Sequence, residues 1–215
     1  VPSLTDLFEN ITDSEDQFFE DMSQEFDDIR DLKEEFESLE LEMLKEKELD
    51  WDEKQSIQKI IEKTKKEINK LEMLSETIES ITNQADKHKL FNSDLLTKFE
   101  ELSKLINDII PENMQNNLKE LQQALDELDI QTLQESLRDL ANNMEQIESD
   151  LDRYLDIFKR FQAEQRLDEI QKRLQQLFEQ QNALSNQIKN LSSDIDMSTS
   201  QRHAEEQQRI SNEFE

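Results

Sequence analysis

The sequence predicts an all-α protein, an elongated antiparallel coiled coil or helical bundle built around one very long C-terminal helix. Three observations support this fold class. The 215 residues include no glycine and only two prolines, so the tight hairpins and bulges of β architectures are disfavoured because many of them need positive φ angles. Hydrophobic residues make up 33% of the chain, too few for a large globular core but enough for narrow seams between helices. Apolar residues also recur every three or four positions.

The first predicted helix covers about residues 3–48. Ser3 can cap its start, with Asp6 three residues later in a pair that resembles a capping box. The apolar stripe then runs from Leu4 to Met43, and Glu15 occupies the position where an apolar residue is expected. At 1.5 Å per residue, this stripe of about 40 residues gives a helix of about 60 Å.

The second predicted helix covers about residues 51–86. The run Asp50-Trp51-Asp52-Glu53 has an N-cap acid with a glutamate three residues later, which is typical of a helix start. Its stripe extends from Ile57 to Ala85. We favour a hairpin at 48–51 that folds this helix back antiparallel on the first. One continuous helix with a phase shift is the alternative, since the turn contains neither glycine nor proline.

Two shorter helices are predicted over 93–110 and 111–128. Asn92 and Ser93 are good cap residues for the first of them. Pro111 ends that helix and is expected to open the next one, because proline is well tolerated in the first helical turn.

The longest predicted helix covers 130–195 and can be capped by Asp129. Its stripe runs from Leu133 to Phe161, slips near 162–166 in a way that resembles a stutter, and resumes from Leu167 to Ile195. A helix of about 65 residues is roughly 95–100 Å long, so it must run past its neighbours or receive shorter helices in series. We therefore expect one elongated unit over 1–195, followed by a polar, weakly helical or frayed tail over 196–215.

The residues needed for familiar active sites and metal sites are missing from the sequence pattern. Cysteine is absent, and the missing glycines argue against phosphate-binding loops and calcium-binding EF-hands. Neither His88 nor His203 has a glutamate three positions before it, the spacing used by di-metal bundles. We expect no catalytic residues, no cofactor and no metal, and we expect that the chain is not an enzyme.

The charge and the aromatic residues bear on partners. The net charge is −28, which predicts repulsion of nucleic acid and anionic lipid, and no apolar run approaches the roughly 20 residues of a membrane span. We expect a protein partner, with basic proteins favoured by the acidic first helix, or self-association. The spacing of the phenylalanines favours packing in the seams between helices, and Trp51 is expected to pack over the hairpin end. Partner binding is the alternative: neighbouring Phe18 and Phe19 cannot both face one seam, and Trp51 lies at a predicted turn, so these three are the candidate partner-binding residues.

Three runs of residues resemble a known group of proteins. The runs Val1–Glu9, Lys47–Gln55 and Leu155–Leu167 are similar to large membrane-anchored bacterial envelope proteins of the Bacteroidetes type. Members of that family have N-terminal membrane helices, an extracytoplasmic region and a long helical segment rich in Glu, Lys and Gln. The resemblance implies a periplasmic location and a membrane-anchored parent protein. It implies no functional residues, because the family has no established activity.

These observations together predict a non-enzymatic structural or scaffolding segment, either an extracytoplasmic spacer or a protein-assembly surface of an envelope protein. The alternative is a cytoplasmic or phage coiled-coil tether that works through self-association. Because the sequence opens on Val1-Pro2, we also expect a piece of a longer or processed protein.

Overall fold

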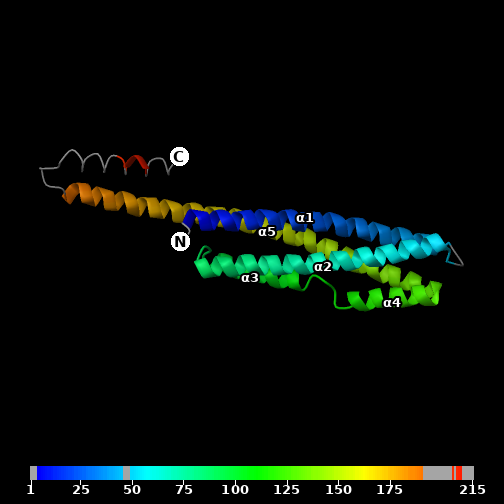
Figure 1. Cartoon of the computed structure of the whole chain (residues 1–215). Coiled ribbons are helices and arrows are strands. Elements are labelled where there is room, and N and C mark those ends of the chain that lie inside the picture. The colour runs from blue at the N-terminus through cyan, green and yellow to red at the C-terminus, as the bar shows by residue number, and fades with distance from the viewer. Residues whose placement is uncertain (1–3, 46–48, 191–204, 206, 210–215) are drawn as a thin grey trace. The chain divides into compact units, whose positions relative to one another are not determined.

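The computed structural model describes residues 4–45, 49–190, 205 and 207–209. These residues form an all-α structure, as the sequence predicts (Figure 1). The labelled helices are α1 (Leu4–Met43), α2 (Trp51–His88), α3 (Ser93–Asn107), α4 (Met114–Glu127) and α5 (Ile130–Asn190), and residues 205 and 207–209 are helical as well. The chain divides into two compact units, residues 1–163 and 164–215. This boundary differs from the single unit expected over 1–195 and falls inside α5, at the slip near 162–166.

The start of α2 follows from a capping box. The Asp50 side chain accepts a hydrogen bond from the Glu53 amide at 2.8 Å, and the Glu53 carboxylate accepts one from the Asp50 amide at 2.8 Å. Both bonds satisfy backbone donors that a helix start would otherwise leave open. Contacts of α2 with α1 are antiparallel, since Lys70 pairs with Asp28 at 2.6 Å while the earlier Lys63 pairs with the later Glu35. The hairpin is therefore the arrangement observed.

Helix α5 runs antiparallel to α1 in a constant register within the first unit. Gln162 donates to Asp16 at 3.1 Å, Lys33 pairs with Glu148 at 2.7 Å, and Arg138 pairs with Glu40 at 2.8 Å. From Asp16 to Glu40 the residue number rises by 24, and from Gln162 to Arg138 it falls by 24. The two helices therefore stay side by side over this whole stretch.

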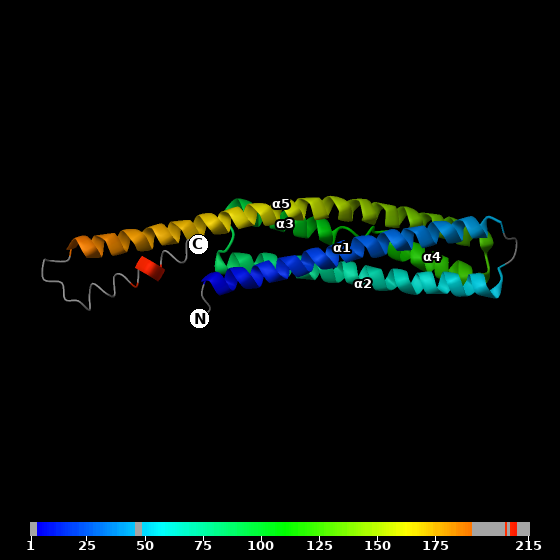
Figure 2. The same ribbon diagram turned by 90° about the horizontal axis from the view of Figure 1, so that it is seen from above.

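Helices α3 and α4 form one broken layer of the bundle. Ser75 bonds to Asn107 at the end of α3, and Gln122 in α4 donates to Gln58 at 3.4 Å. As the residue number falls along α2 from Ser75 to Gln58, it rises by a nearly equal amount from Asn107 in α3 to Gln122 in α4. Both α3 and α4 therefore run antiparallel to α2. The first unit is thus an up-down-up-down bundle of four layers, α1, α2, α3 with α4, and α5 (Figure 2). Short helices in series along the longest one were one of the two arrangements that its length allowed.

The connection between α3 and α4 corrects two expected helix ends. Helix α3 stops at Asn107 instead of 110, and α4 starts at Met114 instead of at Pro111. A residue before proline is driven out of the α region, so Ile110 cannot continue the helix. The Met114 amide instead donates to the Pro111 carbonyl at 2.9 Å, and this turn leads into α4.

Within the described part of the chain, two helices end in a left-handed residue although the sequence has no glycine. Lys89 follows α2 with φ 53°, and Leu128 follows α4 with φ 59°. Such residues let the last carbonyls of a helix accept backbone hydrogen bonds, and the amides of Leu90 and Asp129 do donate back to Ala85 and Ala124. Immediately after the second of these, the Asp129 side chain accepts from the Gln131 and Thr132 amides and caps α5, as the sequence predicted.

The core of the first unit is one continuous cluster that includes a group of aromatic rings. Phe158 of α5 lies 5.0 Å from Phe18 of α1 and 6.0 Å from Phe99 of α3, measured between ring centroids. Phe99 also contacts Phe91 at 4.8 Å. Aromatic pairs at these distances and tilts are favourable beyond the area that they bury. These rings fix three of the four layers at one level of the bundle.

The second unit, taken alone, contains the remainder of α5. Leu177 and Leu184 are buried there, and the Gln181 and Gln207 amides exchange two hydrogen bonds of 3.2 and 3.1 Å. The predicted helical residues 191–195 and most of the predicted tail, 196–215, lie outside the described residues.

Candidate functional site

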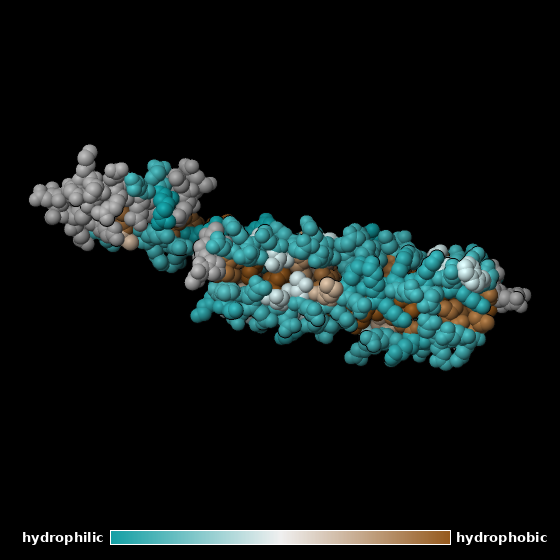
Figure 3. Space-filling model, viewed as in Figure 1, coloured by the Kyte–Doolittle hydropathy of each residue, from teal (hydrophilic) through white to brown (hydrophobic). Residues whose placement is uncertain are grey.

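A large groove lies between α2 and α4 on the surface of the first unit. Helix α4 packs less closely against α2 than α3 does, and the resulting groove has a volume of about 500 Å³. Hydrophobic surface is visible in the furrow between these two helices (Figure 3). The groove falls within the range of roughly 300–1,000 Å³ typical of binding sites.

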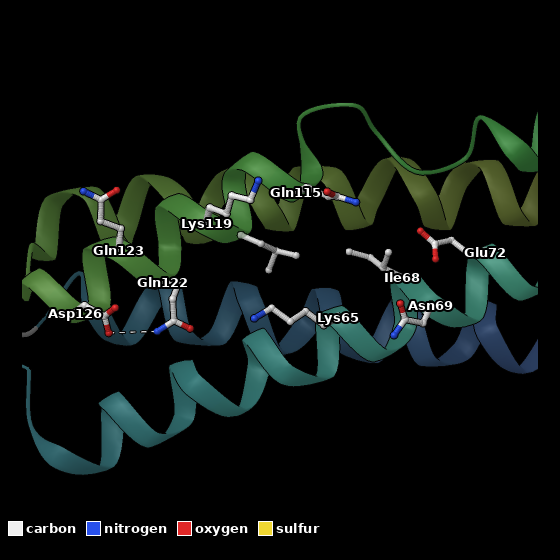
Figure 4. A pocket seen from close by; sticks show the side chains of 10 residues that line it. Lys65, Ile68, Asn69, Glu72, Gln115, Lys119, Gln122, Gln123 and Asp126 are labelled. Carbon is white, nitrogen blue, oxygen red and sulfur yellow. Dashed lines mark hydrogen bonds between the residues drawn. The ribbon is translucent and has the colours of Figure 1, made fainter.

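The groove has an apolar floor and polar walls. Ile68 of α2 (Figure 4) and Leu118 of α4 are almost fully buried and form the floor between the two helices. The walls are made by amide and charged side chains. They are Lys65, Asn69 and Glu72 on α2, and Gln115, Lys119, Gln122, Gln123 and Asp126 on α4. The methylene stems of these long side chains extend the apolar lining, while their polar ends reach water.

Two lysines give the middle of the groove a positive charge. Lys65 projects from α2 and Lys119 from α4, on opposite sides of the apolar floor (Figure 4). Among the described residues, neither lysine forms an ion pair. The acids of the groove lie toward its two ends, and Gln122 already donates to Asp126 at 3.3 Å. An occupant that presents carboxylates at the middle of the groove would therefore meet two available ammonium groups.

A network of charges ties α1 to α2 elsewhere in the first unit. The Lys70 ammonium lies 2.6 Å from Asp28 and 3.5 Å from Glu25, and it also pairs with Glu67 on its own helix. Glu25 and Glu67 are buried. Three carboxylates therefore share one lysine, and Lys66 adds a second, more distant cation at 3.9 Å from Glu67.

The network changes the proton affinity of its members. Burial raises the pKa of Glu25 to about 8, and the neighbouring Glu67 and Asp28 charges add to this, although Lys70 opposes it. For Asp28, burial alone would raise the pKa, but hydrogen bonds from Lys70 and Gln24 outweigh it and lower the pKa. Burial alone would lower the pKa of Lys70, but hydrogen bonds to Asp28 and Glu67 outweigh it and raise that pKa. Glu25 is thus mostly protonated at neutral pH.

The same carboxylates are close enough to share a cation. One oxygen from each of Glu25, Asp28 and Glu67 lies within 4.8 Å of the others. Lys70 already supplies the positive charge at this position. A divalent ion would have to displace the ammonium group, so we interpret the cluster as a structural ion-pair network.

The structure separates the three candidate partner-binding residues. Phe18 is fully buried, and half-buried Phe19 stacks on the same Phe158 ring at 6.3 Å with the Lys159 ammonium 5.4 Å from its own ring. Both neighbours therefore reach one residue of α5, contrary to the reasoning that they could not face one seam. Trp51 is 68% exposed, so it does not pack over the hairpin end and stays available to a partner.

Two further exposed apolar surfaces were not singled out from the sequence. The outer α1 face consists of Leu41, near the end of α1, and Leu44, in the turn directly after it, which are 59% and 55% exposed, with the exposed carboxylates of Glu34 and Glu37 in the turns before them. The exposed α5 stripe, in the second unit, consists of Leu167, Ile170, Leu174 and Phe178. Exposed apolar groups that adjoin on one helix commonly mark contact sites.

Sequence reasoning missed both the groove and the Lys70 network. The network depends on which residues of α1 and α2 come level, and only the hairpin register decides this. A usable signal was the acidic Glu25 on the apolar face of α1, three positions after Met22 and four before Ile29. A charged residue at such a position calls for an ion partner on the facing helix.

None of the described helices combines the length and the hydropathy needed to cross a membrane. Comparisons of the chain with protein-family models, with curated proteins and with solved structures find no match.

Proposed function

We propose that this chain is a non-enzymatic structural segment, a spacer or protein-assembly surface of a bacterial envelope protein. The observation that carries the proposal is the constant register of the four-layer bundle. Contacts from Asp16–Gln162 to Glu40–Arg138 keep α1 and α5 level, and the buried core extends without interruption from Phe8 to Phe158. A bundle that is cross-linked by packing along its whole length resists bending, which is the property that a spacer needs.

The periplasmic setting rests on the resemblance of three sequence runs to membrane-anchored envelope proteins. The role as an assembly surface is supported by features of the structure that a spacer alone would not need. These are the groove between α2 and α4, exposed Trp51 and the outer α1 face. The expected preference for basic partners follows from the 21 acidic and 4 basic residues of 1–53.

A self-associating cytoplasmic or phage tether is a second candidate function. It is favoured by the exposed α5 stripe, in which Leu167 is 68% and Phe178 65% exposed. Unlike the N-terminal quarter, the helical residues 164–190 contain equal numbers of acids and bases, four of each. Two copies of this segment would therefore not repel each other.

Distance measurements test the spacer proposal. The chain has no cysteine, so exposed Glu9 and Glu127 can be replaced by spin-labelled cysteines at opposite ends of the first unit. The register places them about 35 helical residues apart along the bundle, or roughly 50 Å. We expect one narrow distance distribution by pulsed electron resonance. A broad distribution, or one centred well below this value, would show that the bundle cannot act as a spacer.

A further inference from the structure

We propose that the groove between α2 and α4 binds the outer α1 face of a second copy of this chain. This contact supplies a partner for the proposed assembly surface and so rests on that proposed function. The groove offers two lysines on opposite sides of an apolar floor. Its occupant should therefore be a helix that presents an exposed apolar residue with carboxylates beside it.

The outer α1 face has this composition. Glu34 and Glu37 lie seven and four residues before Leu41, and these spacings place all three side chains on one side of a helix. All of them are exposed, and exposed Leu44 continues the apolar surface into the turn directly after α1. An apolar surface preceded by two carboxylates is thus available on the strongly acidic helix α1.

The spacing of charges along the groove matches the spacing along this face. The Gln58–Gln122 contact makes Lys119 level with about residue 61 of α2, so the groove presents Lys119, Lys65, Ile68 and Glu72 in that order along α2. A second α1 helix parallel to α2 would bring Glu34 level with Lys119 and Glu37 level with Lys65.

The same register places the remaining residues against suitable partners. Leu41 comes level with Ile68 and covers the groove floor. Lys45 is exposed in the turn that follows α1, and this end of α1 lies toward Glu72 at the acidic end of the groove. The wall amides, such as that of Asn69, can donate hydrogen bonds to carboxylates of the bound helix that are desolvated in the groove. The two surfaces are therefore complementary in charge, in polarity and in spacing.

The groove cannot be filled by the α1 helix of the same copy. Helix α1 uses Asp28 and Glu35 to contact α2, and Lys33 and Glu40 to contact α5. The side of α1 that carries Leu41 therefore faces away from the bundle and from its own groove. The contact must be intermolecular, and because it joins two different surfaces it either closes a two-fold pair, with each face in the groove of the other copy, or continues from copy to copy.

The contact should be weak. One helix face in one groove covers less than the roughly 1,200 Å² of a stable interface, which suggests a dissociation constant on the order of 100 µM. The net charge of −28 opposes association, but at 0.15 M salt charges more than about 8 Å apart are largely screened. The charges that meet in the groove then dominate over the rest.

Charge reversal on both surfaces tests the proposal in the full chain. Sedimentation equilibrium at 0.15 M salt should show a concentration-dependent mass for the natural sequence. The double variant K65E/K119E should weaken association about tenfold or more. E34K/E37K should do the same, although it makes the chain less acidic and would strengthen association if only general repulsion mattered. Combining all four substitutions should restore association to within about threefold, because the charges then attract again in the reversed sense.

The control is K59E/K104E, which makes the same change in net charge as K65E/K119E at two exposed lysines outside the groove. It should leave association unchanged, and thermal melting should confirm that every variant is folded. A chain that stays monomeric to about 1 mM would overturn the proposal. The proposal would also be overturned if the variant with all four substitutions did not recover association. It would equally be overturned if association survived K65E/K119E and was lost in Leu174→Gln. The distance measurement between Glu9 and Glu127 would be unaffected by these failures, so the spacer proposal is judged separately.

Discussion

Helix α5 carries the same apolar periodicity before and after the slip at 162–166, but the two parts differ in how much of that stripe is covered. In the first part, Leu133, Leu137 and Leu140 are completely buried. In the second, Leu177 and Leu184 are buried, whereas Leu167, Ile170 and Leu174 are 68%, 53% and 47% exposed. The periodicity alone therefore identifies a face that can pack, and it does not tell whether another helix covers that face. Matched substitutions in the two parts can sharpen or break this comparison.

The largest difference is expected when a charge is placed on each part. Leu151 is buried in the first unit and Leu174 is exposed in the second. Leu151→Asp should destabilise the bundle by about 4 kcal/mol or more, because it buries a carboxylate without a partner. Leu174→Asp should change stability by less than about 0.5 kcal/mol. Urea unfolding followed by circular dichroism measures both. Similar losses for the two variants would show that the α5 stripe is covered in solution.

Truncating one phenylalanine in each part should give the next largest difference. Phe158→Ala removes the ring that joins Phe18 to Phe99, and it should cost about 3–5 kcal/mol. Phe178→Ala removes a ring that is 65% exposed, so its cost should lie near zero. Calorimetric melting would compare them. A large effect of Phe178→Ala would mean that the ring packs against a surface in solution.

A change of pH should act on the first unit and leave the α5 stripe unaffected. The folded pKa of Glu25 is about 8 against an ordinary value of 4.5, so between these values the folded state binds more protons than the unfolded state. The stability due to Glu25 is therefore fully present below about pH 4.5 and is lost as the pH rises through 8. The lowered pKa of Asp28 affects stability mainly below this pH range, and the raised pKa of Lys70 affects it mainly above the range.

We expect the first unit to lose about 1–3 kcal/mol between pH 5.5 and pH 8.5. Hydrogen exchange can follow the amides of 130–160 and of 167–178 separately, once the intrinsic effect of pH is removed. Glu25→Gln should abolish the change in the first group, because the neutral amide replaces a protonated carboxyl of the same shape. A loss that persists in Glu25→Gln would assign the pH dependence to another residue.

The smallest expected effect concerns the residue that precedes the buried part of α5. Leu128 has φ 59° and is 51% exposed, so its side chain contributes little burial while its backbone is strained. Leu128→Gly should stabilise the first unit by about 0.5–1 kcal/mol, the net of relief of left-handed strain and a more flexible unfolded chain. Leu128→Ala keeps the strain and should give no gain. Thermal melting would detect the difference, and a gain in the alanine variant would argue against strain as the cause.

The sequence was sufficient for the helices and their order, because the apolar stripe and the cap residues Asp50, Asn92 and Asp129 are local signals. It was not sufficient for the ends of α3 and α4, where Pro111 affects the preceding Ile110 more strongly than the stripe suggested. The groove could not be predicted from the sequence, because the separation of α2 from α4 depends on packing between distant segments. Trp51 could be singled out as a turn residue, but its exposure depends on how the whole hairpin end packs.

The constant register also governs how this protein can change length. Each residue of α1 lies level with defined residues of α2 and α5. The layer formed by α3 and α4 is held in register with α2 by the Ser75–Asn107 and Gln58–Gln122 contacts. An insertion of seven residues in one helix would have to loop out unless the other layers gained seven at the same level. Natural variants with bundles of different length should therefore differ by matched insertions in all four layers. Insertions in one layer alone should occur mainly at 108–113, in the connection between α3 and α4.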